Sequence, residues 1–375
     1  MNLDRLKAYM DTAIPAHGLT GIDCIIYQNH KEIFRHATGA ANLETGELMK
    51  PHSVVNIYSA TKIITCVAIL QLFERGQLSL SEPVHKYIPE FEHMKVKYGT
   101  FTVVPAKNKM TIFHLLNMTS GLSYDSDTPQ LRAMKEAKGD DLDTYDFVKT
   151  VAQSHLLHEP GEGWNYGNSH DVLGLVVERV AGVTFGEYLQ TNIFEPLGIK
   201  NASFRLGEHN QHLLNPQYGF DPQGNITRLP DDCYAHAGKK HESGGGGLIM
   251  SADDYILFAN ALACGGVGAT GERIISKRTI DLMATNYLAD AQLVDYHHFG
   301  MPKGNGYGLG VNVVVDNKQL LSIVPNGSFS WGGAGGVNNL IDPSTGISFY
   351  ISQHLFLAPK HLIGKHMLSI LYSQL

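Results

Sequence analysis

The chain has 375 residues, of which 43% are hydrophobic and 17% are charged, and its formal net charge is -7. Because single hydrophobic cores stop growing at roughly 250–300 residues, we expect two lobes that share one interface. The acidic balance offers no basic surface, so neither nucleic acid nor an anionic membrane is expected as a partner.

The four cysteines are far apart in the sequence and form no Cys-x-x-Cys pair, so we expect neither a zinc knuckle nor a disulfide framework. His155 and His158 are spaced to contact one metal, but no third ligand is indicated, and we expect no metal and no cofactor. The first residues lack the apolar segment of a signal peptide, and no stretch reaches the roughly 18 apolar residues of a membrane span. We therefore predict a cytoplasmic protein, provided that no signal peptide has been removed.

The first predicted element is an amphipathic helix, indicated by apolar residues at helical spacing. These residues are Leu3, Leu6, Tyr9, Met10 and Ile14. Residues 21–27 and 33–38 are separated by a short polar segment and predict a β-hairpin.

The next element is a nearly unbroken apolar helix over 63–73, which Tyr58, Ser59 and Lys62 precede. A helix that is apolar on almost every face is normally buried. Ser59 and Lys62 are three residues apart and therefore share one helix face. Burial lowers the pKa of a lysine, which lets it accept a proton, and a helix N-terminus stabilises an oxyanion. The pair thus fits a nucleophile and its base, although a serine N-cap followed by a surface lysine gives the same pattern.

The middle of the chain predicts a mainly helical lobe. The helical segments are a short helix after Pro83, then 111–116, 126–158, 171–180 and 255–262, and 160–169 is a loop rich in turn formers. Residues 201–243 show no strong period and remain unassigned.

Residues 308–315, 319–324, 336–341 and 347–353 are β-like, and 359–373 predicts a closing helix. Because the links between these strands are short, we expect antiparallel pairing. We predict an α+β fold, with an antiparallel sheet built from both termini, flanked by helices, and a mainly helical inserted lobe. The predicted division is 1–58 plus 300–375 for the sheet lobe and 59–299 for the helical lobe, with the active site at their interface.

Three short motifs occur in order: Ser59-x-x-Lys62, Tyr166-x-Asn168 and Trp331-Gly332-Gly333. Together with residues 114–122, 160–161, 245–248 and 307–310, they resemble the serine β-lactamase and penicillin-binding protein superfamily over nearly the whole chain. The class C β-lactamase-like branch and its family VIII carboxylesterases are the most similar.

This resemblance implies that Ser59 is the acyl-forming nucleophile, Lys62 its base or proton relay, and Tyr166 the residue that protonates the leaving group. It also implies an oxyanion hole made by the backbone N–H groups of Ser59 and Ala334. Asn168 would orient the acyl part of the substrate, but an asparagine beside a glycine fits a simple turn equally well. Gly332 and Gly333 would let the substrate approach the strand.

The third motif departs from the Lys-Thr-Gly of β-lactamases, whose cation helps to recognise a carboxylate. Trp331 is neutral and instead offers an apolar or stacking wall, as in family VIII esterases. We therefore predict a serine hydrolase that acts on small-molecule carboxylic esters. The alternatives are an acyltransferase to an alcohol, a β-lactamase or D-amino-acid peptidase, and a non-catalytic binding or sensor module. Nothing in the sequence indicates an oligomeric state.

Overall fold

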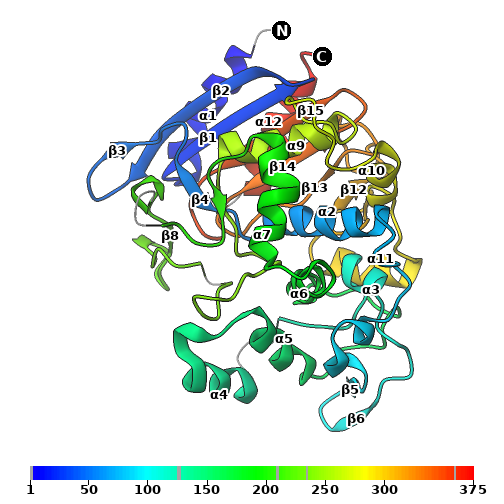
Figure 1. Cartoon of the computed structure of the whole chain (residues 1–375). Coiled ribbons are helices and arrows are strands. Elements are labelled where there is room, and N and C mark those ends of the chain that lie inside the picture. The colour runs from blue at the N-terminus through cyan, green and yellow to red at the C-terminus, as the bar shows by residue number, and fades with distance from the viewer. Residues whose placement is uncertain (1–2, 125–127, 208–210, 234, 359) are drawn as a thin grey trace.

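The computed structural model describes residues 3–124, 128–207, 211–233, 235–358 and 360–375. Its centre is an antiparallel sheet of eight strands in the order β11-β12-β13-β14-β15-β1-β2-β3. Strands from the two ends of the chain lie side by side in it (Figure 1). The strand bounds are β1 Gly21–Gln28, β2 Lys31–Asn42, β3 Glu47–Leu48, β11 Asn305–Tyr307, β12 Asn312–Val314, β13 Phe329–Ser330, β14 Asn338–Asp342 and β15 Ile347–Ser352.

Strand β1 pairs with β2 on one side and with β15 on the other, so that Cys24 lies opposite both His36 and Ile351. This pairing confirms the predicted hairpin and the sheet built from both termini. The side chains of β1 alternate between two hydrophobic clusters, because Cys24 and Ile26 belong to one and Ile25 to the other. Both faces of the sheet are therefore covered.

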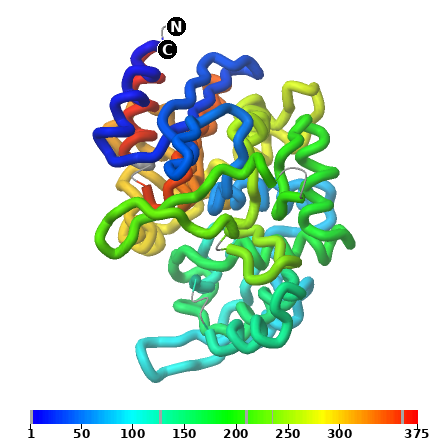
Figure 2. Tube along the Cα trace, turned by 90° about the vertical axis from the view of Figure 1, so that its left-hand side faces the viewer, coloured from blue at the N-terminus to red at the C-terminus, as the bar shows by residue number. Residues whose placement is uncertain are grey.

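Helices α1 (Asp4–His17) and α12 (Lys360–Tyr372) cover one face of the sheet and contact each other. Figure 2 shows the two helices side by side, and Tyr9 hydrogen-bonds His366. Helix α9 (Ala252–Ala263) packs against β1, β14 and β15. It thus belongs to the sheet layer although it lies within 59–299, and the division of the chain at residues 59 and 299 stays a prediction.

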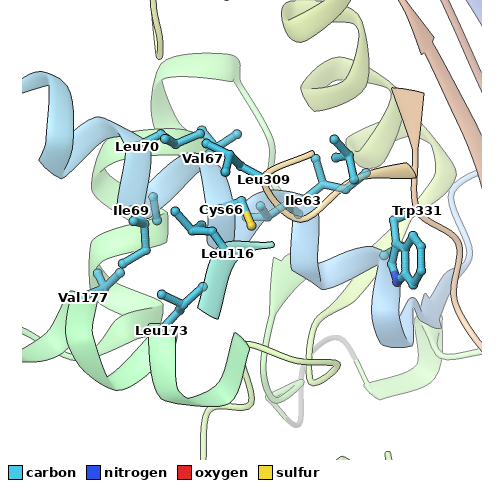
Figure 3. Close-up of a cluster of buried hydrophobic side chains, with 14 of the residues drawn as sticks. Ile63, Cys66, Val67, Ile69, Leu70, Leu116, Leu173, Val177, Leu309 and Trp331 are labelled. Atoms are coloured by element: carbon cyan, nitrogen blue, oxygen red, sulfur yellow. The ribbon is translucent and has the colours of Figure 1, made fainter. Parts of the chain in front are cut away.

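Helix α2 (Thr61–Glu74) lies below the sheet and packs against α6 (Ser169–Ala181). Every residue from Thr61 to Leu72 is buried, as the all-round apolar pattern predicts. Figure 3 shows Cys66 of this helix beside Leu116, Val67 beside Leu309, and Ile69 on the side of Val177. Lys62 is thus the one charged residue within the buried stretch from Thr61 to Leu72.

Of the other helices, α4 and α5 lie in the lower half of the molecule, whereas α10 lies higher, beside β12 (Figure 1). The bounds of these other helices are α3 Ile112–Leu116, α4 Pro129–Lys138, α5 Thr144–Ala152, α7 Phe185–Leu189, α8 Glu195–Leu197, α10 Lys277–Met283 and α11 Asp290–His298. Residues 126 and 127 of the predicted 126–158 segment lie outside the described residues. Within the described ranges, no helix combines the length and hydrophobicity that a membrane span needs.

Three small sheets complete the fold, and two of them include strands from the segment 201–243, which was left unassigned from the sequence. They are β4-β10-β7 (Val54–Asn56, Ile249–Ser251, Ala202–Ser203), β5-β6 (Lys95–Tyr98, Thr102–Pro105) and β8-β9 (Tyr218–Phe220, Ile226–Arg228). Strand β4 leads directly toward Ser59, so this sheet helps to fix the start of α2.

The predicted strand over 319–324 is wrong. The segment forms a turn in which the Ser322 N–H donates to the Asn317 carbonyl, and Leu321 has a positive φ of 50°. Two of its apolar residues lie outside the core, because Leu321 is 88% exposed and Ile323 is 54% exposed, whereas Val324 is buried. A run of apolar residues without a period of two was therefore insufficient evidence for a strand.

Glu178, near the end of α6, predicts a pH dependence of stability. Burial raises the pKa of its carboxyl to about 7, while the Phe185 backbone N–H opposes this shift. The folded state therefore keeps a proton that the unfolded chain releases, so stability falls as the pH rises from about 4.5 to about 7. We expect Glu178→Gln to make the decrease in the free energy of unfolding over this pH range smaller by about 1–2 kcal/mol. Urea unfolding at several pH values checks this, with the exposed Glu136→Gln as control, and an unchanged pH profile contradicts it.

Candidate active site

Ser59 lies in the short 3-10 turn η1 (Tyr58–Ala60), immediately before α2. The preceding residue, Tyr58, has a positive φ of 47°, a conformation that costs a non-glycine residue roughly 1–3 kcal/mol. Tyr58 is nevertheless held in place, because its side chain is buried and its hydroxyl donates to Gln217. The surrounding structure thus fixes the backbone beside the predicted nucleophile.

The hydroxyl of Ser59 is contacted by two other predicted residues. The Lys62 ammonium lies 3.2 Å from Ser59 Oγ, and the Tyr166 hydroxyl lies 2.6 Å from it. Tyr166 comes from the loop before α6, and the Lys62 Nζ atom lies 4.7 Å from the centre of its ring. Ser59, Lys62 and Tyr166 therefore form one hydrogen-bonded group.

Lys62 is fully buried, and its ammonium has three acceptors: Ser59 Oγ, the Tyr124 hydroxyl at 2.9 Å and the Gly245 carbonyl oxygen. A lysine ammonium carries three N–H donors, so this set satisfies all of them. The site thus compensates the burial of a cation with directed hydrogen bonds.

Trp331 contacts the tyrosine of this group. Its indole Nε1 donates a hydrogen bond of 3.1 Å to the Tyr166 hydroxyl, and the two ring centres are 5.4 Å apart. The Tyr166 oxygen therefore accepts from Trp331 while its proton points to Ser59 Oγ. The sequence predicted an apolar wall here but not this N–H donor.

Gly332 and Gly333 allow close packing of the chain with itself. An added Cβ at Gly333 would lie 2.0 Å from the Ile57 carbonyl oxygen, and one at Gly332 would lie 2.5 Å from the Val337 carbonyl oxygen. The late strand segment thus approaches the backbone just before Ser59. The next residue, Ala334, lines the same cavity as Ser59. The assignment of an oxyanion hole to the N–H groups of Ser59 and Ala334 stays a prediction.

Asn168 is almost completely buried, and its Nδ2 donates to the Ser123 carbonyl oxygen at 2.9 Å. It also lines the cavity that contains Ser59. Its amide therefore ties the loop carrying Tyr166 to the segment before Tyr124, and its predicted contact with the acyl part of a substrate stays a prediction.

The cavity beside Ser59 has a volume of about 410 Å³ and is mostly walled by aromatic and small residues. These lining residues include Tyr58, Tyr124, Tyr166, Ala334 and Phe356. A cavity of this size lies within the usual range of roughly 300–1,000 Å³ for small-molecule sites.

A family model described as Beta-lactamase matches residues 4–360 of the chain. The chain belongs to the Beta-lactamase family. Esterase EstB of Burkholderia gladioli is 29% identical over 92% of this chain and 88% of that protein. Monacolin J acid methylbutanoyltransferase of Aspergillus terreus is 26% identical over 91% of this chain and 86% of that protein. The solved structure of EstCE1, a hydrolase with promiscuous acyltransferase activity, has a TM-score of 0.82 at 23% identity and covers 98% of both chains. These relatives support a serine hydrolase-type enzyme.

Two residues of this Beta-lactamase family site were missed by sequence reasoning. Tyr124 accepts from Lys62, and although its side chain is 40% exposed, burial around the hydroxyl raises its pKa well above 10. Asp171, at the start of α6, accepts from the Ser243 hydroxyl and from the Gly245 N–H, and burial raises its pKa. Asp171 therefore holds the residue whose carbonyl accepts from Lys62.

Neither Tyr124 nor Asp171 carries a sequence signal of its own. Tyr124 follows the predicted 114–122 segment by two residues, and Asp171 is the first-turn acid of a helix, a common position for Asp. The described residues contain no group of three His, Cys, Asp or Glu side chains that could hold a metal ion. The expectation that His155 and His158 bind no metal stays a prediction.

Proposed function

We propose that this protein is a carboxylesterase that forms an acyl-enzyme on Ser59. The observation that carries the proposal is the position of Ser59 Oγ, within hydrogen-bonding distance of both the Lys62 ammonium and the Tyr166 hydroxyl. A serine hydroxyl is a weak nucleophile until an adjacent group removes its proton. The short distances from Lys62 and Tyr166 to Ser59 Oγ support a role for both residues in that transfer.

In the proposed acylation, the Lys62–Tyr166 pair has first lost one proton to solvent, so that one of the two groups is a free base. Ser59 Oγ then attacks the ester carbonyl carbon and its proton passes to that base. The developing oxyanion is stabilised by the backbone N–H groups of Ser59 and Ala334. The bond to the alcohol oxygen then breaks, and Tyr166 returns the proton to that oxygen. A water molecule attacks the acyl carbon in the second half, releasing the acid and restoring the Ser59 hydroxyl.

Trp331 supports an ester rather than a β-lactam or peptide as the substrate. Its indole lies against Tyr166 and carries no charge with which to bind a carboxylate. The relative Esterase EstB supports the same choice. Small and medium acyl groups fit the cavity volume of about 410 Å³.

Acyl transfer from Ser59 to an alcohol is the second candidate, because Monacolin J acid methylbutanoyltransferase is a relative over most of the chain. Both reactions share the acylation step and differ only in the group that attacks the acyl-enzyme. Turnover of p-nitrophenyl butyrate in rising concentrations of a primary alcohol separates them. A transferase yields mainly the new ester, whereas an esterase yields mainly butyric acid.

The test of the proposal is mass spectrometry of the intact protein, quenched during turnover of p-nitrophenyl acetate or butyrate. We expect a transient acyl mass on the wild type, none on Ser59→Ala, and little hydrolysis of nitrocefin. Efficient nitrocefin turnover would instead favour the β-lactamase alternative. A folded protein that acquires no adduct from any of these substrates would favour a binding module.

A further inference from the structure

Lys135 on α4 stands out among the residues that line the cavity beside Ser59. Helix α4 lies in the lower half of the molecule, away from the sheet (Figure 1). Leu131 and Lys135 are one turn apart on this helix, and both line the cavity. A helical side chain leans toward the N-terminus, so the stem of Lys135 extends over the turn of buried Leu131. The geometry directs an exposed cation to the apolar wall of the cavity.

The lysines around Lys135 are paired, but Lys135 is not. Lys138 binds Asp146, Lys239 binds Asp140 and Lys240 binds Asp141. Lys135 has no ion-pair partner in the part of the chain that the structure describes. Its charge is therefore available to a ligand in the cavity.

The other charged group on the cavity wall is Asp171, at the Lys62 end. Asp171 is buried and already accepts hydrogen bonds from Ser243 and Gly245. A second negative charge beside this carboxyl is unfavourable, because like charges repel each other. An anionic substrate group would thus be disfavoured near Asp171 and favoured near Lys135. Phe147 and Leu131 supply apolar surface of the same cavity.

We propose that the site prefers esters whose acyl chain ends in a negatively charged group, with that group bound by Lys135. This proposal rests on the proposed esterase function and names its substrate class. The acyl part is chosen because it remains attached to Ser59 after the alcohol has left, so the cavity beside Ser59 must hold it. An acyl chain with an apolar middle and an anionic end suits a cavity lined by Ser59, by the apolar side chains of Leu131 and Phe147, and by Lys135.

The test compares two p-nitrophenyl esters of equal length, mono-p-nitrophenyl adipate and its neutral methyl ester. The four methylenes of adipate prevent the efficient intramolecular attack that shorter diacid esters undergo. We expect the wild type to prefer the anionic ester by roughly fivefold in kcat/KM, and rising salt to weaken the preference. Lys135→Gln should abolish it, Lys135→Glu reverse it and Lys135→Arg retain it. The readout is the ratio of kcat/KM for the anionic ester to kcat/KM for the neutral ester, because a general loss of activity leaves this ratio unchanged.

Lys318→Gln, which removes an exposed lysine outside the cavity, is the matched control. Equal kcat/KM for the two esters in the wild type would overturn the inference while leaving the esterase function intact. The inference would also be overturned if Lys135→Gln and Lys318→Gln changed the preference equally. It would be overturned as well if kcat/KM depended on Lys135 only for an ester whose anionic group lies on the leaving alcohol and not on the acyl chain. If the wild type hydrolysed none of the three esters, that is, neither adipate ester nor p-nitrophenyl butyrate, the proposed function itself would be overturned.

Discussion

We expect Lys62→Met to lower kcat for p-nitrophenyl butyrate by about 10³- to 10⁴-fold. Methionine fills the buried space of the lysine stem but supplies no N–H donor. Ser59 Oγ, the Tyr124 hydroxyl and the Gly245 carbonyl would all lose the ammonium that they share. Stopped-flow measurement of the p-nitrophenol burst checks whether the loss lies in acylation.

The matched control is Thr65→Val. Thr65 lies on the same helix, and its hydroxyl donates to the Gly244 carbonyl at 2.7 Å. The variant therefore also removes a buried hydrogen bond to the glycine segment, residues 244–247. It does not touch Ser59, and we expect its rate to stay within about tenfold of the wild type. Equal losses in the two variants would mean that disturbance of the glycine segment, and not the ammonium, explains the effect. Urea unfolding confirms that both variants are folded.

Tyr166→Phe is expected to lower kcat by about 10³-fold. The variant keeps the ring that packs on Trp331 but removes the hydroxyl that bridges Trp331 Nε1 and Ser59 Oγ. The double variant with Lys62→Met should lose much less than the product of the two single losses, because groups that act as a unit are not additive. Steady-state kinetics of the four proteins measures the coupling.

Tyr124→Phe is the control for this tyrosine, because its hydroxyl also belongs to the group around Lys62 but does not contact Ser59. We expect this variant to lower kcat by about tenfold, because the Lys62 ammonium loses one of its hydrogen-bond acceptors. If Tyr124→Phe were as damaging as Tyr166→Phe, the special role given to Tyr166 would be wrong. Full additivity of Tyr166→Phe and Lys62→Met would contradict the proposed proton transfer through both residues.

The local part of the site could be predicted from the sequence. Ser59 and Lys62 meet because residues three apart share a helix face, and their helix is buried because it is apolar all round. The sheet from both termini followed from the position of the β-like segments. Tyr166, Asn168 and Trp331 could be selected only through the family resemblance, because no local rule connects residues so far apart.

The missed features depend on contacts between distant segments. Tyr124 was not singled out because an isolated tyrosine after a turn is normally a surface residue, and only the fold brings it to Lys62. The Trp331 N–H bond depends on the path of the segment before Ala334. The wrong strand over 319–324 has a different cause, since composition favoured β-structure but the turn at Asn317 and Ser322 prevented pairing.

The pairing of β1 with β15 has a consequence for biosynthesis. Strand β1 leaves the ribosome long before β15, yet the two strands hydrogen-bond along their length. Until residues 347–352 emerge, one edge of β1 exposes unpaired backbone groups, which invite pairing with other chains. Such non-local strand pairs also form slowly. A nascent chain that ends before β15 already contains Ser59, Lys62, Tyr166 and Trp331 in its sequence, but it lacks the strand that closes the sheet behind them.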